Sequence, residues 1–233
     1  MASFIISSDG FCPAASERIG EITGKEKEER YTVCCLLSKK RMGRFERRDF
    51  SPGTPLLDLY YATVKKNIGK AREMLLRADV IFVVGGNTYT LLGRLRRSGL
   101  DEVLKSRINE KKLVFCGASA GGIVWCDYGH SDSRGPRITR AKGLGMVPIV
   151  FSPHFLSDGR RRPYAEEDVF RAAKEGLPIV GLERADLEVT GGKFTVYTGG
   201  DAYAAQRLTV RDGNCVTSDL PVGVTKPLED LLK

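Results

Sequence analysis

The sequence predicts an α/β fold, specifically a three-layer α/β/α sandwich around a mostly parallel sheet. Short apolar runs alternate with stretches of helical periodicity along the chain, which is the pattern of strand–helix–strand units with right-handed crossovers. The run Val80–Val84 is continuous, β-branched and aromatic, as in strands that are buried on both faces of a parallel sheet. The 233 residues contain no evident linker or repeat, so we expect one domain spanning residues 1–233.

The elements follow in order from these patterns. The apolar positions 64, 68, 71, 75 and 78 share one helical face, and the Gly191-Gly192 turn between two short apolar runs predicts a β-hairpin near the C-terminus. Strands are expected at Ser3–Ser7, Tyr31–Leu37, Val80–Val84, Leu113–Cys116, Pro148–Phe151, Pro178–Gly181, Leu187–Thr190, Lys193–Tyr197 and Ala204–Val210, and helices at residues 64–78, Thr88–Arg97, Leu100–Ile108 and Ala165–Lys174.

The composition is that of a globular protein, with 42% hydrophobic and 28% charged residues and a net charge of +8. The positive charge suggests an acidic partner: nucleic acid, a membrane surface or an anionic substrate. Basic residues concentrate in Lys39–Pro55 and Cys126–Gly145, which we expect to be long loops. Neither segment carries a nucleic-acid-binding signature. The sequence shows no signal peptide or membrane span, and its six cysteines form no CxxC pair, which favours a cytoplasmic protein with reduced thiols and no metal site.

A G-x-S-x-G motif, Gly117–Gly121, follows one predicted strand and precedes a predicted helix. This context is what a nucleophile elbow requires, because the sharp turn lifts the serine hydroxyl above the sheet. Ser119 is therefore the candidate nucleophile. The amide of Ala120, the next residue, is placed to contribute to an oxyanion hole. A plain glycine-rich turn is the alternative.

A serine nucleophile needs a base and an acid that orients it. The chain has two histidines. His154 follows the strand Pro148–Phe151, where α/β folds keep their sites, whereas His130 lies in a polar stretch and is expected to be a solvated loop residue. Glu183 follows the strand Pro178–Gly181 in the same way. Asp132 is a rival acid, and Asp127 is another.

Val84-Gly85-Gly86-Asn87-Thr88 ends another buried strand. Its glycines allow a ligand to approach the backbone closely. The segment is therefore expected to supply a second oxyanion amide or to bind a phosphate. It is neither a Walker motif nor a dinucleotide-binding fingerprint.

Together these residues resemble the peptidase E family, which comprises serine dipeptidases, cyanophycinases and relatives on a class I glutamine amidotransferase-like, flavodoxin-like fold. The matching pieces lie in the family's order across residues 79–200, about half of the chain. They are Val84–Thr88 with Leu91-Leu92, Gly117–Gly121, Pro153-His154-Phe155 and Gly181-Leu182-Glu183.

The resemblance implies a serine-type dipeptidase with Ser119 as nucleophile, His154 as general base and Glu183 as the third triad member, with Asp132 as the alternative acid. It implies oxyanion amides at Gly86 and Ala120 and no metal or organic cofactor. It further implies dipeptides with an N-terminal aspartate as substrates, with an arginine that binds the aspartate carboxylate. The substrate-binding candidates here are Asn87, Arg161 and Arg162, although these arginines lie nearer the histidine than the family's arginine does.

Three other hypotheses remain open. In the first, the chain is a catalytically divergent relative. In the second, it is a cyanophycinase-like β-aspartyl hydrolase with an acidic pocket formed by Glu166, Glu167 and Asp168. In the third, it is a nucleic-acid-binding protein. The expected partner is a small peptide, with neither nucleic acid nor membrane. The sequence leaves the oligomeric state open, with a homodimer among the options.

Overall fold

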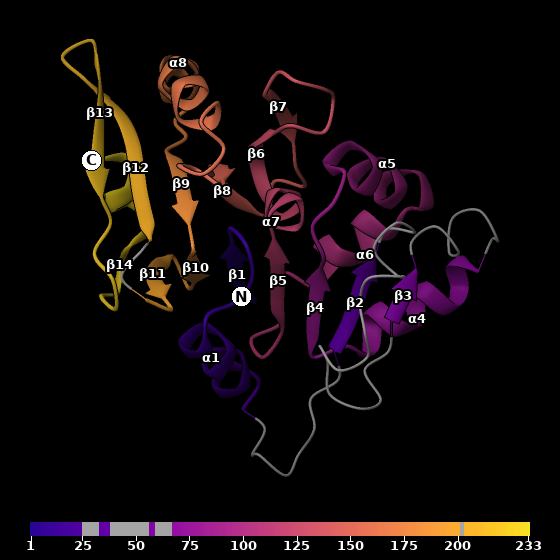
Figure 1. Ribbon diagram of the computed structural model, residues 1–233. Coiled ribbons are helices and arrows are strands. Elements are labelled where there is room, and N and C mark those ends of the chain that lie inside the picture. The colour runs from indigo at the N-terminus through magenta and orange to yellow at the C-terminus, as the bar shows by residue number, and fades with distance from the viewer. Residues whose placement is uncertain (25–32, 38–55, 59–66, 201–202) are drawn as a thin grey trace.

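A computed structural model of the chain describes residues 1–24, 33–37, 56–58, 67–200 and 203–233. Within these residues the strands form two sheets, one of eight strands and one of six (Figure 1). The predicted α/β class is confirmed. The parallel strands, however, are divided between the two sheets, and antiparallel strands extend each of them, so that parallel pairing is only partial.

The eight-stranded sheet has the order β14-β11-β10-β1-β5-β4-β2-β3. Its five parallel strands are β1 (Ser3–Ser7), β2 (Val33–Leu37), β3 (Leu56–Asp58), β4 (Val80–Val83) and β5 (Val114–Ala118). The predicted hairpin, β10 (Ala185–Thr190) with β11 (Lys193–Thr198), pairs antiparallel with β1, and the short β14 (Lys226–Pro227) follows.

The six-stranded sheet has the order β13-β12-β9-β8-β6-β7. Its parallel strands are β6 (Cys126–Ser131), β8 (Val147–Pro153) and β9 (Ile179–Glu183). The antiparallel strands are β7 (Thr139–Lys142), β12 (Ala204–Arg211) and β13 (Asn214–Asp219).

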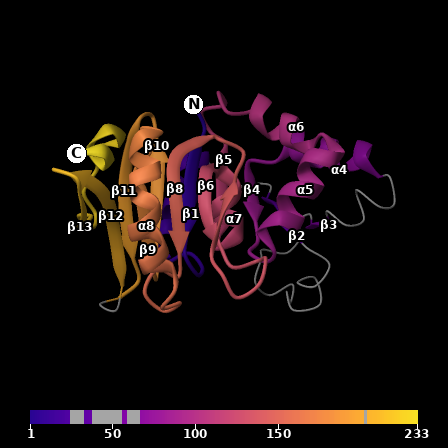
Figure 2. The same ribbon diagram turned by 90° about the horizontal axis from the view of Figure 1, so that it is seen from above.

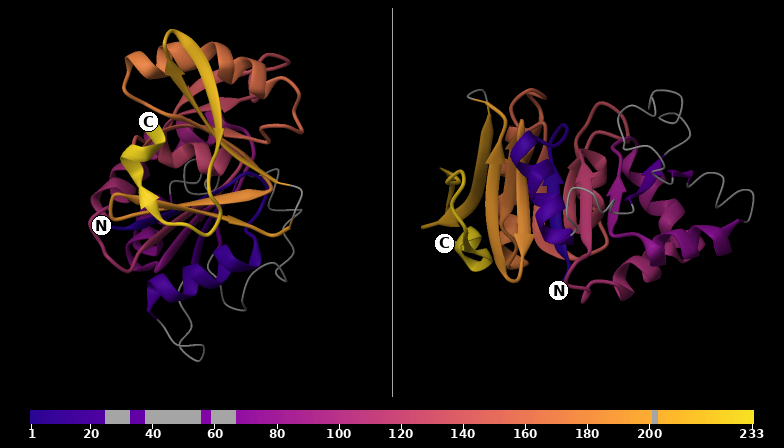
Figure 3. Two further views of the ribbon diagram at one scale, coloured as in Figure 1. Left: turned by 90° about the vertical axis from the view of Figure 1, so that its left-hand side faces the viewer. Right: turned by 90° about the horizontal axis from the view of Figure 1, so that it is seen from below.

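Helices cover the outer faces of both sheets and fill the space between them (Figures 2 and 3). Helix α1 (Pro13–Thr23) packs on one face of the first sheet, and α8 (Arg161–Lys174) packs on the outer face of the second. The largest apolar core contacts both sheets and includes α4 (Ile68–Arg77), α5 (Thr88–Ser98), α6 (Leu100–Ser106) and α7 (Ala120–Trp125). A short 3-10 helix, η2 (Leu228–Leu232), ends the chain. None of the described helices combines the length and apolar character that a membrane crossing requires.

The segment Cys126–Gly145 differs from its prediction as a long loop. It forms β6 and β7, and the β6 side chain of His130 is fully buried. A carboxylate buried beside this polar strand partners its histidine, since Asp168 of α8 contacts the His130 Nε2 at 3.3 Å. A pattern search for apolar alternation misses such a strand. The basic stretch Lys39–Pro55 lies outside the described residues.

The register of the parallel strands brings their carboxyl ends together. Ser7 of β1 pairs with Ala118 of β5, and Pro153 of β8 pairs with Leu182 of β9. Residues that immediately follow these strands therefore gather at one edge of the fold, the place where α/β proteins bind their ligands.

Candidate active site

Ser119 occupies a tight turn between β5 and α7, with a φ of 54°. The motif glycines are required by packing. A Cβ on Gly117 would collide with the backbone of Gly121, and a Cβ on Gly121 would collide with the carbonyl oxygen of Val83. The Ser119 amide donates to the Ser7 carbonyl at 2.9 Å, which ties the turn to the end of β1. This is the strand–turn–helix context of a nucleophile elbow.

His154 reaches this serine from the second sheet. It follows β8 directly with a φ of 52°, and its Nε2 lies 2.9 Å from the Ser119 Oγ. The two residues are 35 positions apart in the chain. The structure thus brings together the serine and the histidine that the sequence selected, at the distance of a hydrogen bond.

A residue that the sequence analysis missed contacts the other ring nitrogen. Asp9, in the turn after β1, places its Oδ1 at 2.8 Å from the His154 Nδ1. Its Oδ2 accepts hydrogen bonds from the Ser8 hydroxyl at 2.6 Å and from the Arg184 amide at 3.2 Å. Partial burial raises the pKa of Asp9, but the Ser8 hydrogen bond, the charge of His154 and the Arg184 amide outweigh burial, and the net pKa lies below its ordinary value.

Glu183 lies beside the histidine loop, and its carboxylate contacts that loop. Its Oε2 accepts hydrogen bonds from the amides of Leu156 and Ser157, at 3.1 and 3.0 Å, and from the Ser157 hydroxyl at 2.9 Å. From the sequence, Glu183 was expected to contact the imidazole. The structure places Asp9 there, and Glu183 holds the segment that follows His154.

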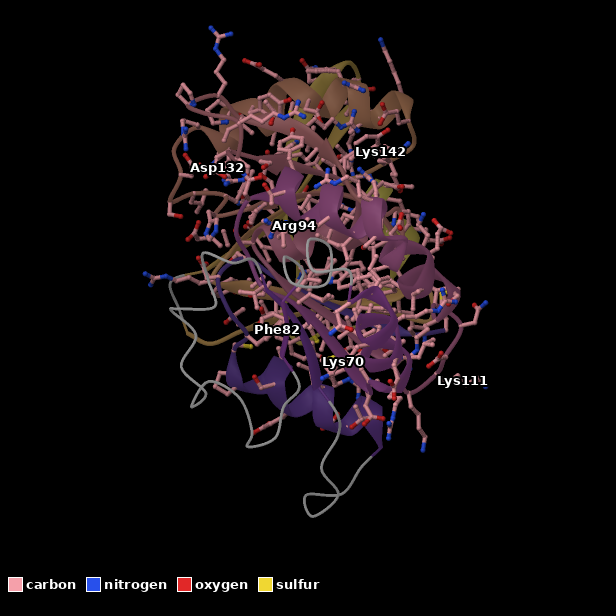
Figure 4. The ribbon with its side chains drawn as sticks, turned by 90° about the vertical axis from the view of Figure 1, so that its right-hand side faces the viewer. Lys70, Phe82, Arg94, Lys111, Asp132 and Lys142 are labelled. Atoms are coloured by element: carbon pink, nitrogen blue, oxygen red, sulfur yellow. The ribbon has the colours of Figure 1, made fainter. Side chains whose placement is uncertain are left out.

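Asp132 also lies away from the imidazole. It is on the loop after β6 (Figure 4), where its carboxylate is half-exposed and lies 3.3 Å from Arg161. Arg161 is buried and also contacts Asp158 and the His130 carbonyl. The structure thus gives Arg161 to an internal network, while Arg162 pairs with Glu166 along α8.

His130 is not the solvated histidine that the sequence suggested. Burial lowers its pKa, although Asp168 acts in the opposite direction. The same Asp168 lies 3.3 Å from Arg140. Of the three acidic residues proposed for an acidic substrate pocket, Asp168 is thus buried in this cluster and Glu166 is paired with Arg162.

The Gly85-Gly86-Asn87 segment packs directly against the elbow. A Cβ on Gly85 would lie 2.9 Å from the Ala118 carbonyl oxygen and 3.2 Å from the Ser119 Cβ, so the close approach requires glycine. Asn87 caps α5, since its Oδ1 accepts from the Thr90 amide at 2.9 Å, and its Nδ2 donates to the Ser133 carbonyl at 3.0 Å. Its side chain therefore has a structural role at the rim of the site.

Backbone strain marks the same place. Positive φ angles outside glycine occur at Ser119, His154 and Arg184, with Asp212 in a distant turn as the fourth case among the described residues. Such conformations cost about 1–3 kcal/mol each and gather at functional sites. Three strained residues thus meet around one serine–histidine contact.

The match to known proteins agrees with this geometry. The model of peptidase family S51 matches residues 61–197, which is more than half of the 233 residues. The chain belongs to peptidase family S51. The matched range includes Ser119, His154 and Glu183, and it excludes Asp9. The resemblance to peptidase E is confirmed by relatives that carry this name.

This member of family S51 is 30% identical to "Peptidase E" of Streptomyces coelicolor over 61% of the chain and 62% of that protein. It is 32% identical to "Probable alpha-aspartyl dipeptidase" of Drosophila melanogaster, over 52% of the chain and 55% of that protein. The Bacillus subtilis "Uncharacterized peptidase YgaJ" is 40% identical over 39% of each chain. The matches thus span between 39% and 62% of the length of these relatives.

A solved structure supports the fold. The crystal structure of a peptidase from an acI-B1 Actinobacterium superposes with a TM-score of 0.64 over 97% of both chains, at 18% identity. At this identity the likeness concerns the fold alone.

Proposed function

We propose that this protein is a serine peptidase that hydrolyses short peptides through an acyl-enzyme. The observation that carries the proposal is the 2.9 Å contact between the Ser119 Oγ and the His154 Nε2 at a strained elbow. Serine and imidazole at hydrogen-bond distance form the nucleophile–base pair of acyl transfer. Membership in family S51 supports the same assignment. We also propose that residues 1–233 act as a single domain, since one apolar core contacts both sheets.

The proposed reaction has two steps. The Ser119 Oγ attacks the scissile carbonyl carbon while its proton moves to the His154 Nε2, and the tetrahedral intermediate collapses as that proton passes to the leaving amine and the C–N bond breaks. A water molecule then gives a proton to His154 and attacks the ester carbonyl. The carboxylic acid product leaves as His154 returns the proton to the Ser119 Oγ. His154 accepts or donates the proton in each of these transfers.

The negative charge on the carbonyl oxygen needs donors in both steps. We propose the backbone amides of Gly86 and Ala120, because Ala120 directly follows the nucleophile and the glycine segment packs against the elbow. Loss of one such donor typically lowers the rate about 10²–10³-fold.

For the substrate we propose dipeptides with an N-terminal aspartate. The printed name of the Drosophila relative supports this class. For the substrate carboxylate we propose Arg184, because it is exposed and its amide contacts Asp9 beside His154. An arginine fork matches both oxygens of a carboxylate.

The test compares wild type with Ser119→Ala on aspartyl-leucine and alanyl-leucine dipeptides. We expect the variant to lose cleavage and to resist labelling by a fluorophosphonate, which attacks only an activated serine. Undiminished cleavage by Ser119→Ala would remove this residue from the chemistry. A wild type that takes the label but cleaves no aspartyl dipeptide would refute the substrate class alone and favour the β-aspartyl alternative.

Arg184→Met tests the recognition of the aspartate. We expect KM for the aspartyl dipeptide to rise about tenfold or more, as for the loss of a charged hydrogen bond, with little change for alanyl-leucine. Arg162→Met is the matched control, because Arg162 pairs with Glu166 on α8. An equal effect of both variants, or no effect of Arg184→Met, would contradict the assignment.

A further inference from the structure

The acid that orients His154 comes from the N-terminal turn of the chain. We propose that Asp9 is the positioning residue of His154 and takes the place that the sequence gave to Glu183. The inference rests on the proposed function of Ser119 and His154. Its direct support is the 2.8 Å distance between the Asp9 Oδ1 and the His154 Nδ1, on the opposite side of the ring from the serine.

The carboxylate of Asp9 is itself held in place. Its Oδ2 accepts from the Ser8 hydroxyl and the Arg184 amide, at 2.6 and 3.2 Å, which leaves Oδ1 for the imidazole. Ser8 is fully buried and its amide donates to the Ala185 carbonyl at 3.3 Å. Donors from two separate strand ends therefore fix the orientation of the acid, as a preorganised site requires.

This geometry selects the productive state of the imidazole. When the Nδ1–H points to Asp9, the lone pair of Nε2 faces the Ser119 hydroxyl and can accept its proton. The nearby negative charge then stabilises the imidazolium that forms. The lowered pKa of Asp9 keeps the carboxylate ionised at neutral pH.

Glu183 has a different task. Its Oε2 receives three hydrogen bonds from Leu156 and Ser157, just beyond His154 in the chain. The carboxylate thereby closes the turn that carries the histidine, and it does so through hydrogen bonds that a glutamine carbonyl can also accept. The two acids are therefore separable by substitution.

The kinetic test compares Asp9→Asn with Glu183→Gln. Asn keeps the shape of Asp but offers the Nδ1 nitrogen an amide, which favours the wrong tautomer. We expect kcat/KM to fall roughly 10²–10⁴-fold in Asp9→Asn, by analogy with other serine hydrolases. In Glu183→Gln we expect a loss of less than about tenfold, because the three donors still find an acceptor. The acidic limb of the plot of kcat/KM against pH should change in Asp9→Asn and not in Glu183→Gln. The reverse order of effects would overturn the proposal.

A second readout does not need activity. A histidine Nδ1–H bound to a carboxylate gives a proton NMR signal far downfield, and the chain has only two histidines. His130 has no partner at Nδ1 within the described residues. The variant His130→Gln shows which downfield signal belongs to His154, because it removes any signal of His130. On a Ser119→Ala background, we expect Asp9→Asn to remove the His154 signal and Glu183→Gln to retain it. Retention in a folded Asp9→Asn variant refutes the proposal.

This readout also separates the two hypotheses. If the protein cleaves no peptide and takes no fluorophosphonate label, the proposed function fails, while the NMR signal still reports whether Asp9 holds His154. If the peptidase is active but Asp9→Asn leaves kcat/KM unchanged, only the role of Asp9 fails. Thermal melting of each variant identifies any loss of fold. Should Asp9→Asn not fold, Ser8→Ala takes its place, and a kcat/KM equal to that of wild type would refute the proposal.

Discussion

Gly181 of β9 lies against Phe155, the residue that follows His154 in the chain. A Cβ on Gly181 would lie 2.5–2.7 Å from three ring atoms of Phe155. Phe155 is fully buried and directly follows His154. The Phe155 amide also donates to the Leu182 carbonyl at 3.1 Å. The substitution Gly181→Ala is therefore expected to displace Phe155 and, with it, the adjoining backbone of His154.

The expected magnitude follows from these distances. Carbon atoms pack at about 3.5–4.0 Å, so the ring of Phe155 must move by roughly 1 Å to accept the new methyl group. A close-packed core resists such a shift, and overpacking typically costs about 1–3 kcal/mol of unfolding free energy. A comparable displacement of His154 from Ser119 would lower kcat/KM by up to about 10²-fold.

The assay combines urea unfolding with peptide cleavage or fluorophosphonate labelling. Gly20→Ala is the matched control, because Gly20 lies within α1 with no atom within 4 Å of the added Cβ. That variant should gain about 0.5–1 kcal/mol through its better helix propensity. Wild-type stability and activity in Gly181→Ala would refute the reasoning. A loss of stability with full activity would show that Phe155 moves independently of His154.

Three other predictions concern single residues. Gly121→Ala should abolish labelling of Ser119, because the new Cβ collides with the Val83 carbonyl; labelling at the wild-type rate would contradict the elbow geometry. Burial lowers the pKa of His130 in the folded protein. As the pH falls below the ordinary histidine pKa of about 6.5, the unfolded chain therefore binds a proton at this residue before the folded protein does, and the free energy of unfolding decreases. The difference in urea midpoint between wild type and His130→Gln should therefore narrow from about pH 7.5 to 5.5. A constant difference would contradict this linkage. Arg161→Ala should lose about 3 kcal/mol of stability, against less than about 1 kcal/mol for Arg162→Ala, as measured by urea unfolding; equal losses would disprove the structural role of Arg161.

The apolar elements of the fold were predictable because burial leaves a pattern in the sequence. The strand predicted at Ser3–Ser7 agrees with β1, and the helix predicted at Thr88–Arg97 lies within α5. The division into two sheets was not predictable in this way, since it depends on which strands pair. The polar strand β6 was also missed, because its charged neighbours from α8 become apparent only when the chain is folded.

The candidate site shows the same limit. Ser119 and His154 each follow an apolar strand, and a short motif or the scarcity of histidine drew attention to them. Glu183 follows a strand as well, and proximity alone could not show which partner its carboxylate meets. In the structure that partner is the loop at Leu156 and Ser157.

Asp9 satisfies the rule that selected the other residues. It lies two positions beyond β1, and β1 is the direct neighbour of β5 in the sheet, with Ser7 opposite Ala118. Any side chain in the turn after β1 must therefore lie beside the turn that holds Ser119. The strand was predicted, but its neighbours were not, so this turn could not be assigned to the site. Once the strand order is known, the turn after β1 is placed beside Ser119, and Asp9 in that turn becomes a candidate acid for the histidine that contacts this serine.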